Sequence, residues 1–330
     1  MTPNPSNLRG ALLALLSFGF FSSADVIVKY VGASYSPFQN IFFSTLFGFP
    51  LVAMLLMSDR AEENLIPHRP KLSLLRAGLV VVNALCGFYA FAVLPMSQAY
   101  PIFFSAPLMI TVFAIPLLGE KVGLHRGIAV VVGLIGVVIV VRPGGAHFGL
   151  GHAAALLAAM FYAINSILLR MMGQSERSVV IMLYPMLGNF VVSGLALPFV
   201  YKPLPIEHLG LLAAMSAIGF VAGLVMIAAY RRAPAGIVAP MQYSQIIWGV
   251  LFGAVFFSET ADWVTFLGTG IIIASGFYIV QREGKPHVSR NRPVTEARAA
   301  QDMGLTARLS SWRKIWDRRP MRATDYDDPS

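Results

Sequence analysis

Residues 94–120 read LPMSQAYPIFFSAPLMITVFAIPLLGE, and residues 233–259 read APAGIVAPMQYSQIIWGVLFGAVFFSE. The second stretch aligns with the first without a gap, at a distance of 139 positions (95 to 234). Two prolines, a serine and the closing glutamate coincide: Pro95 with Pro234, Pro101 with Pro240, Ser105 with Ser244, and Glu120 with Glu259. Chance is a poor explanation for four matches in one register, so the sequence contains an internal repeat. A weaker match aligns Asp25 and Lys29 with Ser166 and Arg170.

The composition assigns the chain to the membrane. Hydrophobic residues make up 56% of the sequence and charged residues 12%, and apolar runs of about 20 residues recur along most of its length. The N-terminal apolar run, residues 9–30, is longer than a signal peptide and contains charges, so we expect it to remain in the mature protein. The one cysteine, Cys86, excludes a disulfide within the chain and a thiolate metal cluster.

Apolar windows between charged or Pro/Gly-rich breaks predict ten transmembrane helices. They cover residues 9–31, 37–58, 72–94, 97–118, 123–142, 150–171, 178–201, 207–230, 234–258 and 261–281. With the N-terminus inside, the outer connections hold only Lys29, Arg142 and Lys202. The inner connections hold Arg9, Arg60, Arg69, Lys71, Arg76, Lys121, Arg126, Arg170, Arg177, Arg231 and Arg232. The positive-inside rule therefore predicts that both termini are cytoplasmic.

Each repeat holds five of the predicted helices. Because five is odd, the second copy enters the membrane from the opposite side, which gives the inverted repeats that are found mostly in transporters. The predicted fold is thus an all-α membrane protein with ten transmembrane helices in two inverted five-helix repeats. The predicted divisions are a cytoplasmic N-terminus (1–8), a first repeat (9–142), a second repeat (143–281) and a basic cytoplasmic tail (282–330).

The predicted tail is rich in Arg, Pro, Asp and Ser, a composition typical of disorder. Within it, Leu305, Leu309, Trp312 and Trp316 share one face of a potential helix that is flanked by basic residues. Such a helix could lie on anionic membrane lipid. A solvated basic tail without a specific partner is an equal alternative, and nucleic acid is not an expected partner.

Asp25 and Lys29 lie four residues apart inside the first predicted helix. This spacing places them on one face, one turn apart, so their charges can pair. Lys29 is near the outer end, where it could equally anchor the helix at the interface. Asp25 lies about 24 Å along the helix from Arg9, too deep for an anchor. It could take up a proton, bind a cationic part of a substrate, or only neutralise Lys29, and we expect a functional role.

Further polar residues lie within the predicted spans, where they are expected to face protein or a wet cavity. The candidates for contact with a substrate or coupling ion are Asn83, Tyr89, Tyr100, Ser105, Tyr162, Asn165, Gln242, Tyr243, Gln245 and Trp248. The densest cluster is PMQYSQIIW, residues 240–248, whose amides and aromatic rings suit a polar, planar or zwitterionic ligand. Hydrogen bonding between helices is the alternative role for such side chains, and it is favoured for the isolated Asn189.

The repeated prolines have a structural interpretation. Pro95 and Pro234 lie at predicted helix starts. Pro101 and Pro240 lie a few residues further in, where each removes a backbone donor. The carbonyl groups that lose their partners there could line a cavity.

The repeated glutamates also have a structural interpretation. Glu120 and Glu259 each end one predicted helix and shortly precede the next. The free N–H groups at the start of the next helix favour a negative charge. We therefore predict that both glutamates are structural caps.

No motif in the sequence supports catalysis. The phosphate-loop GxxxxGK[ST], HExxH and GxSxG patterns are all absent from it. The six histidines fall in connections, helix ends and the tail, on both sides of the membrane. They are expected to be solvated rather than to bind a metal, and we expect no cofactor and no enzymatic activity.

In its spans and its repeat, the chain resembles EamA-type members of the drug/metabolite transporter superfamily over nearly all of residues 9–281. The most specific parts are residues 74–122 and 233–260, which include the repeated prolines and glutamates. The segment SSADVIVKYVG, residues 22–32, is similar to the first helix of S-adenosylmethionine uptake carriers, and riboflavin carriers of the same family are a further comparison. The resemblance implies ten helices around a central substrate cavity in a bacterial inner membrane.

The leading hypothesis is therefore a secondary carrier of a small metabolite that works by alternating access. The expected cavity is lined by predicted helices one, three, four, six, eight and nine. The substrate is expected to be amino-acid-like, nucleoside-like or a vitamin, with a proton or sodium as possible coupling ion and membrane lipid as the surroundings. The alternatives are an exporter of amino acids or drugs with the same fold, and a non-transporting membrane enzyme or receptor.

Overall fold

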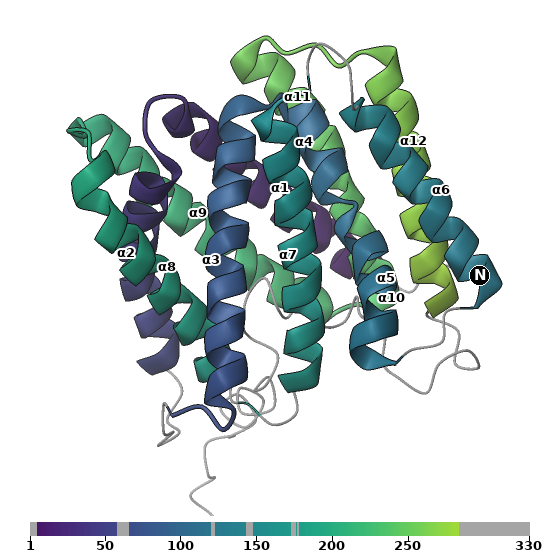
Figure 1. Cartoon of the computed structure of the whole chain (residues 1–330), viewed down its shortest axis with the longest axis horizontal. Helices are drawn as coiled ribbons and strands as arrows, with labels where there is room; N and C mark the ends of the chain where they lie inside the picture. Colours follow the sequence, from purple (N-terminus) through teal and green to yellow (C-terminus); the bar gives the residue numbers. More distant parts are fainter. Residues whose placement is uncertain are drawn as a thin grey trace, which may run out of the picture.

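The computed structural model describes residues 5–57, 66–119, 123–142, 148–172, 176 and 178–283. The described part is a bundle of twelve α-helices and one 3₁₀-helix (Figure 1). The helices are α1 (Pro5–Gly32), α2 (Pro37–Met57), α3 (Pro70–Val93), α4 (Met96–Phe103), α5 (Ala106–Leu118), α6 (Leu124–Val141), α7 (Leu150–Met172), α8 (Ser178–Val200), α9 (Ile206–Tyr230), α10 (Ala235–Val238), the 3₁₀-helix η1 (Ala239–Tyr243), α11 (Ser244–Phe257) and α12 (Trp263–Glu283). The predicted all-α fold class is confirmed. The tail segment around Trp312, including the predicted amphipathic helix, lies outside the described residues.

Seven helical stretches of the described chain are long and apolar enough to cross a membrane, and two shorter apolar helices lie in α6 and α12. The fourth predicted span is covered by α4 and α5 together, and the ninth by α10, η1 and α11. The prolines explain why these two spans are broken. Pro101 and Pro240 lack the N–H that a continuous helix needs, and the regular helix is interrupted within a few residues of each.

The two broken spans match position by position. In the first, α5 begins after Ser105; in the second, α11 begins at Ser244, the residue that corresponds to it in the repeat. Both helices end in the left-handed backbone region, at Gly119 (φ 66°) and at its counterpart Ser258 (φ 54°). This conformation reverses the chain sharply at the end of each helix.

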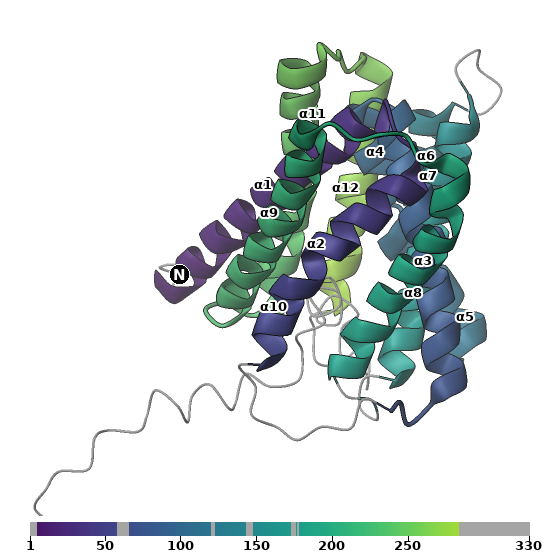
Figure 2. The ribbon, with the colours of Figure 1, turned by 90° about the vertical axis from the view of Figure 1, so that its left-hand side faces the viewer.

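The packing of the helices follows the repeat. In the repeat, α1 corresponds to α7 and α3 corresponds to α9. Helix α1 packs against α9, and α3 packs against α7, so the same contact occurs twice with the two halves exchanged. Helix α2 packs against its counterpart α8, and α6 against its counterpart α12. Figure 2 shows α1 and α9 side by side. Helices of the two halves therefore pack against one another throughout the described bundle, in pairs that follow the repeat.

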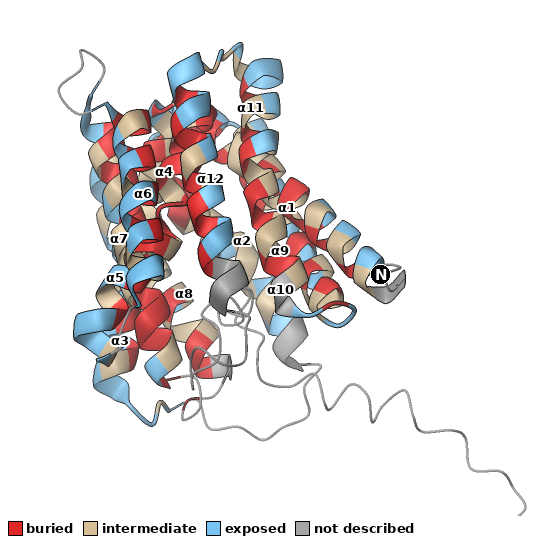
Figure 3. Ribbon diagram, turned by 90° about the vertical axis from the view of Figure 1, so that its right-hand side faces the viewer, coloured by how far each residue is buried: buried red, intermediate tan, exposed pale blue. Residues whose placement is uncertain are grey.

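Burial is arranged as expected for a bundle in lipid. Figure 3 shows buried residues between the helices and exposed residues on the outer faces of α6 and α12. The exposed side chains there are large and apolar, as at Ile128, Val131 and Ile135 of α6 and at Phe266 and Leu267 of α12. Such a surface suits acyl chains rather than water.

Lys29 lies near one end of the bundle, which we call the Lys29 end. Helices α1, α3 and α11 finish there, and α2, α4, α7 and α12 begin there (Figure 1). Under the predicted topology it is the outer end, while the placement of both termini in the cytoplasm stays a prediction.

Candidate functional site

A cavity of about 400 Å³ lies among α1, α3, α4 and α7. Its lining residues are Asp25, Val28, Asn83, Ala84, Gly87, Phe88, Phe91, Phe103, Ala158, Ala159 and Tyr162. Three predicted site residues, Asp25, Asn83 and Tyr162, thus meet in one place. These four helices correspond to predicted spans one, three, four and six; spans eight and nine do not contribute to this lining. The volume is in the range of small-molecule sites.

Asp25 is the charged residue of this cavity. The hydroxyl of Tyr100 in α4 donates a hydrogen bond to Oδ2 of Asp25 over 2.6 Å. Tyr100 itself is buried, with 3% of its surface exposed, so its position is fixed by packing. The carboxylate is therefore held at a defined point on the wall, where a cation or a proton could reach it from the cavity.

Aromatic rings and small residues form much of the remaining wall. Phe91 contacts the ring of Tyr100 edge to face, with centroids 5.3 Å apart, and the ring of Phe103 at 5.0 Å. Small side chains at Ala84 and Ala158 leave the space open. A carboxylate beside aromatic faces is a setting that binds positively charged, flat or partly apolar ligands, because the ring faces attract cations.

The predicted ion pair between Asp25 and Lys29 is wrong. Nζ of Lys29 lies 2.8 Å from Oε1 of Glu259 and donates a hydrogen bond to the carbonyl oxygen of Leu94 over 2.5 Å. The spacing in α1 permits a pair, but Asp25 points toward α4, and a second carboxylate and a free carbonyl lie near the end of the helix. The alternative prediction of an interfacial anchor is also wrong, because Lys29 is buried within protein, with 9% of its surface exposed.

Glu259 is a cap, but of another helix than the one predicted. Its Oε2 accepts a hydrogen bond from the backbone N–H of Met96 over 2.8 Å. Met96 is the first residue of α4, so Glu259 caps a helix that lies 163 residues away in sequence rather than α12, which follows it. The negative charge still meets the free N–H groups of a helix start. Its counterpart Glu120 lies outside the described residues.

The predicted PMQYSQIIW cluster does not line this cavity. Tyr243 is buried in the core, where its ring packs against Phe104 with centroids 5.4 Å apart. Trp248 lies against Gly19 of α1 and packs against Phe252. Ligand contact by these side chains and by Gln242 and Gln245 stays a prediction.

Three other predicted contacts also lie away from the lining. Tyr89 packs against the main apolar core, and Ser105 donates a hydrogen bond to the carbonyl of Ile102 over 2.6 Å. Asn165 is buried on α7, and its Oδ1 accepts no hydrogen bond from the described residues. Their predicted roles in transport stay predictions.

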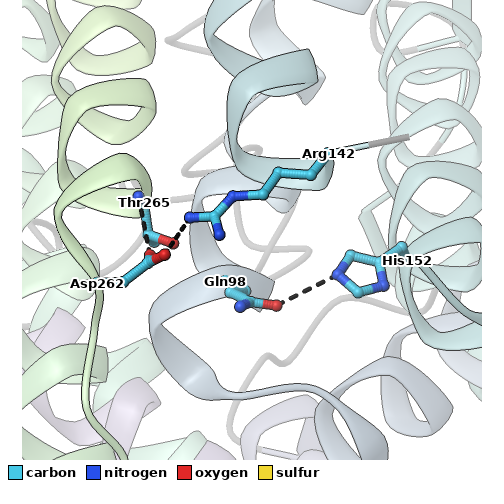
Figure 4. A network of polar contacts seen from close by, with 5 residues as sticks. All are labelled: Gln98, Arg142, His152, Asp262 and Thr265. Atoms are coloured by element: carbon cyan, nitrogen blue, oxygen red, sulfur yellow. Dashed lines mark hydrogen bonds and ion pairs between the residues drawn. The ribbon is translucent and has the colours of Figure 1, made fainter. Parts of the chain in front are cut away.

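A second polar group at the Lys29 end was missed by the sequence reasoning (Figure 4). The guanidinium of Arg142 pairs with Asp262, which also accepts a hydrogen bond from the N–H of Thr265 over 3.0 Å. The hydrogen bonds from Thr265 and Arg142 lower the pKa of Asp262 to about 2. These contacts join α6 to the start of α12 and hold the two halves together.

The prediction of solvated histidines is wrong for His152. This residue is buried in the first turn of α7, with 5% of its surface exposed, and its Nε2 lies 3.2 Å from Oε1 of Gln98 (Figure 4). Within the described ranges, no group of three or more His, Cys, Asp or Glu side chains could hold a metal ion.

Arg76 has a structural role that the sequence signals but that we did not predict. It is buried in α3, and its Nη1 donates a hydrogen bond to the carbonyl of Ile181 over 2.6 Å. That carbonyl lacks its helical partner because residue 185, four positions later in α8, is a proline. Arg76 therefore satisfies a buried carbonyl that would otherwise stay unpaired.

Comparison with known proteins gives one family match and a match to a solved structure. The EamA-like transporter family matches residues 8–142 and 149–281. A crystal structure of a protein that is 16% identical covers 84% of this chain and 98% of its own, with a TM-score of 0.58, which supports the fold.

Sequence relatives are transporters that carry different names. The S-adenosylmethionine uptake transporter of Rickettsia bellii is 26% identical over 271 residues, which cover 82% of this chain and 93% of that protein. The pseudopaline exporter of Pseudomonas aeruginosa is 25% identical, covering 81% of this chain and 94% of that protein. An uncharacterised transporter of Helicobacter pylori is 29% identical, with coverage of 81% and 92%.

Proposed function

We propose that this chain, which belongs to the EamA-like transporter family, is a secondary carrier that moves a positively charged or zwitterionic metabolite through the cavity around Asp25. Membership makes it a multi-pass membrane transporter of small metabolites. Alternating access is the proposed mechanism: the two halves rock around the cavity and expose it to one side of the membrane at a time. The proposed location is a bacterial inner membrane, with both termini in the cytoplasm.

The observation that carries this proposal is the Asp25 carboxylate at the wall of an aromatic cavity. A charge at the centre of a membrane span costs about 2.5 to 3.5 kcal/mol on insertion scales. A functional role for Asp25 best explains why the span contains such a costly residue. The hydroxyl of Tyr100 holds the carboxylate in place, 2.6 Å away. A cationic ligand would be met by the carboxylate and by the faces of neighbouring rings together.

S-adenosylmethionine is the favoured substrate. It has a sulfonium cation, an amino-acid group and a planar purine, and these chemical features fit one carboxylate, aromatic walls and the amide of Asn83 in the lining. The relative of that name in Rickettsia bellii supports the same choice. Coupling to a proton is compatible with Asp25, since a carboxylate can exchange a substrate cation for a proton, while coupling to sodium is the other option.

Export is the second candidate function. The relative from Pseudomonas aeruginosa is named an exporter, and it covers nearly as much of this chain as the uptake transporter does. Exchange of substrate for a proton at Asp25 would drive an amino-acid-like metabolite outward under an inward proton gradient. Amino acids and riboflavin therefore belong in the substrate screen.

The test uses purified protein in proteoliposomes and two ligands that differ in one charge. S-adenosylhomocysteine lacks the sulfonium methyl group and hence the cation, but it is otherwise the same molecule. We expect the parent protein to bind and transport S-adenosylmethionine at least about tenfold better, equivalent to ~1.4 kcal/mol. Asp25→Asn should lose this preference, while Asp262→Asn, an aspartate at the bundle surface, should keep it.

The outcomes separate the hypotheses. If Asp25→Asn transports at the parental rate across pH at equal protein amount, Asp25 is structural and the proposal fails. A second outcome is that neither S-adenosylmethionine nor S-adenosylhomocysteine is transported, but an amino acid or riboflavin is. In that case Asp25→Asn must abolish the observed transport, or the proposal of a substrate site at Asp25 fails. Uptake driven by an imposed proton or sodium gradient identifies the coupling ion.

A further inference from the structure

The Lys29 cluster consists of the side chains of Lys29 and Glu259, the carbonyl oxygen of Leu94 and the N–H of Met96. Three short polar contacts connect them: Lys29 to Glu259 at 2.8 Å, Lys29 to Leu94 at 2.5 Å, and Met96 to Glu259 at 2.8 Å. Nζ of Lys29 also lies 5.2 Å from the ring centre of Phe257. The cluster is thus a connected group and not an isolated surface pair.

The cluster joins the two halves of the chain. Lys29 lies in the last turn of α1, and Leu94 and Met96 form the corner between α3 and α4, all within the first matched half. Glu259 follows α11 in the second matched half. Glu259 is therefore the residue that ties the second half to both elements of the first.

The cluster lies directly beyond the substrate cavity on two helices. Val28 and Phe91 line the cavity; Lys29 follows Val28 directly on α1, and Leu94, the residue after the end of α3, follows Phe91 by three positions. At 1.5 Å per residue, Lys29 is about 6 Å along α1 from Asp25. On α4, Met96 precedes Tyr100 by one turn, so the same helix carries both the cap and the hydroxyl that holds Asp25.

The cluster is largely shielded from solvent and closely packed. The side chains of Lys29 and Glu259 are only 10% and 15% exposed. Glu259 can approach α11 because residue 253 is a glycine: a Cβ there would lie 2.7 Å from Oε2 of Glu259, closer than real contacts allow. The backbone N–H of Glu259 donates a hydrogen bond to the carbonyl of Gly253 over 3.0 Å.

From these contacts we propose that the Lys29 cluster is the gate that closes the substrate cavity at the Lys29 end, and that it is closed in this structure. The inference rests on the proposed function of the Asp25 cavity. To open this end, the α11–α12 connection must move away from α1 and from the α3–α4 corner, and water must replace the partners of both charges. The gate therefore stabilises the state in which the cavity is shut at this end, and its two charges are not substrate ligands.

The test measures access to the cavity with a cysteine reporter. Cys86, the one native cysteine, is first replaced by alanine, and Ala84→Cys then places a thiol in the cavity wall. A membrane-impermeant maleimide is applied to intact cells, which expose one face, and to inside-out vesicles, which expose the other. The labelling rate of the reporter from each face reports whether that end is open, and no substrate is needed.

We expect slow labelling of the parent reporter from the face at the Lys29 end. Lys29→Met should raise that rate at least about tenfold. Gly253→Ala should act in the same direction without changing a charge, because the added methyl group displaces the carboxylate of Glu259. Gly270→Ala is the matched control, since a Cβ at that helical glycine meets no atom within 4 Å, and it should label at the parent rate.

Parental labelling from both faces in Lys29→Met and in Gly253→Ala, at equal protein amount in the membrane, would overturn the gate. If Lys29→Met protein does not accumulate, Gly253→Ala decides alone. Because labelling requires no ligand, the outcome is independent of substrate identity: faster labelling without any Asp25-dependent transport would support the gate and reject the proposed function.

Discussion

The buried pair of Lys29 and Glu259 should contribute to stability in a strongly non-additive way. With both side chains at most 15% exposed, solvent screens their interaction little. Removing one partner of a buried pair costs about 3–5 kcal/mol, because the other charge stays buried without compensation. Glu259→Gln keeps an oxygen that can accept from Met96, so we expect about 3 kcal/mol. Lys29→Met leaves a bare carboxylate and an unpaired Leu94 carbonyl, so we expect about 5 kcal/mol.

The double variant should cost much less than the sum of the single variants. With both charges gone, the remaining loss is the hydrogen bond to the Leu94 carbonyl, about 1–3 kcal/mol. Because the single variants together cost about 8 kcal/mol, the coupling free energy between Lys29 and Glu259 is then at least about 5 kcal/mol. Reversible unfolding of the four proteins in mixed detergent micelles, followed by circular dichroism, gives the four free energies of unfolding.

A matched cycle on Arg142 and Asp262 provides the control. This pair also joins the two halves at the Lys29 end, but its side chains are 42% and 49% exposed. Solvent screening should therefore reduce its coupling to about 0–1 kcal/mol. If the effects of Lys29→Met and Glu259→Gln add within about 0.5 kcal/mol, the reasoning about the buried pair is refuted.

Two further predictions concern pH and a proline-freed carbonyl. The lowered pKa of Asp262, about 2, means that its contribution to stability is present above its ordinary pKa of 3.8 and is lost as the pH falls through 2. The difference in unfolding midpoint between the parent and Asp262→Asn should therefore hold from pH 7 to about 5 and shrink steadily as the pH falls from 4 to below 2. Arg76→Leu should lower the free energy of unfolding by about 1–3 kcal/mol through the unpaired Ile181 carbonyl. In a Pro185→Ala background the loss should be smaller, because residue 185 can then donate to that carbonyl; equal losses in both backgrounds would contradict this explanation.

The spans could be predicted from the sequence because they depend on local properties. Length and hydrophobicity determine where a helix crosses a membrane, and the predicted spans 37–58 and 178–201 correspond closely to α2 and α8. The sequence predicts residues 97–118 and 234–258 as single spans with a lost backbone donor at Pro101 and Pro240, and the structure adds that the regular helix is interrupted near each proline. The 139-residue repeat then related one broken span to the other.

The partners of charged side chains could not be predicted, because they come from distant parts of the chain. Helical spacing indicates only which residues share a face of one helix, and it suggested a pair within α1. The actual partner of Lys29 is 230 positions away, and the helix that Glu259 caps begins 163 positions before it. The prediction for His152 failed for the same reason. Its position at a helix start suggests exposure to solvent, but its side chain contacts Gln98 of α4, which the sequence does not place beside it.

The two charges of α1 therefore have separate partners, and separate roles follow. Asp25 is bound to α4 at the cavity wall, while Lys29 is bound to the α3–α4 corner and to the second half of the chain. A change at Asp25 should alter the choice of substrate and leave access to the cavity unchanged. A change at Lys29 should alter access and leave the preference for a cationic ligand unchanged. If Asp25 and Lys29 act as one unit, each variant should change both the binding preference and the labelling rate. Measuring both properties in Asp25→Asn and in Lys29→Met therefore shows whether the two residues have separate roles or a shared one.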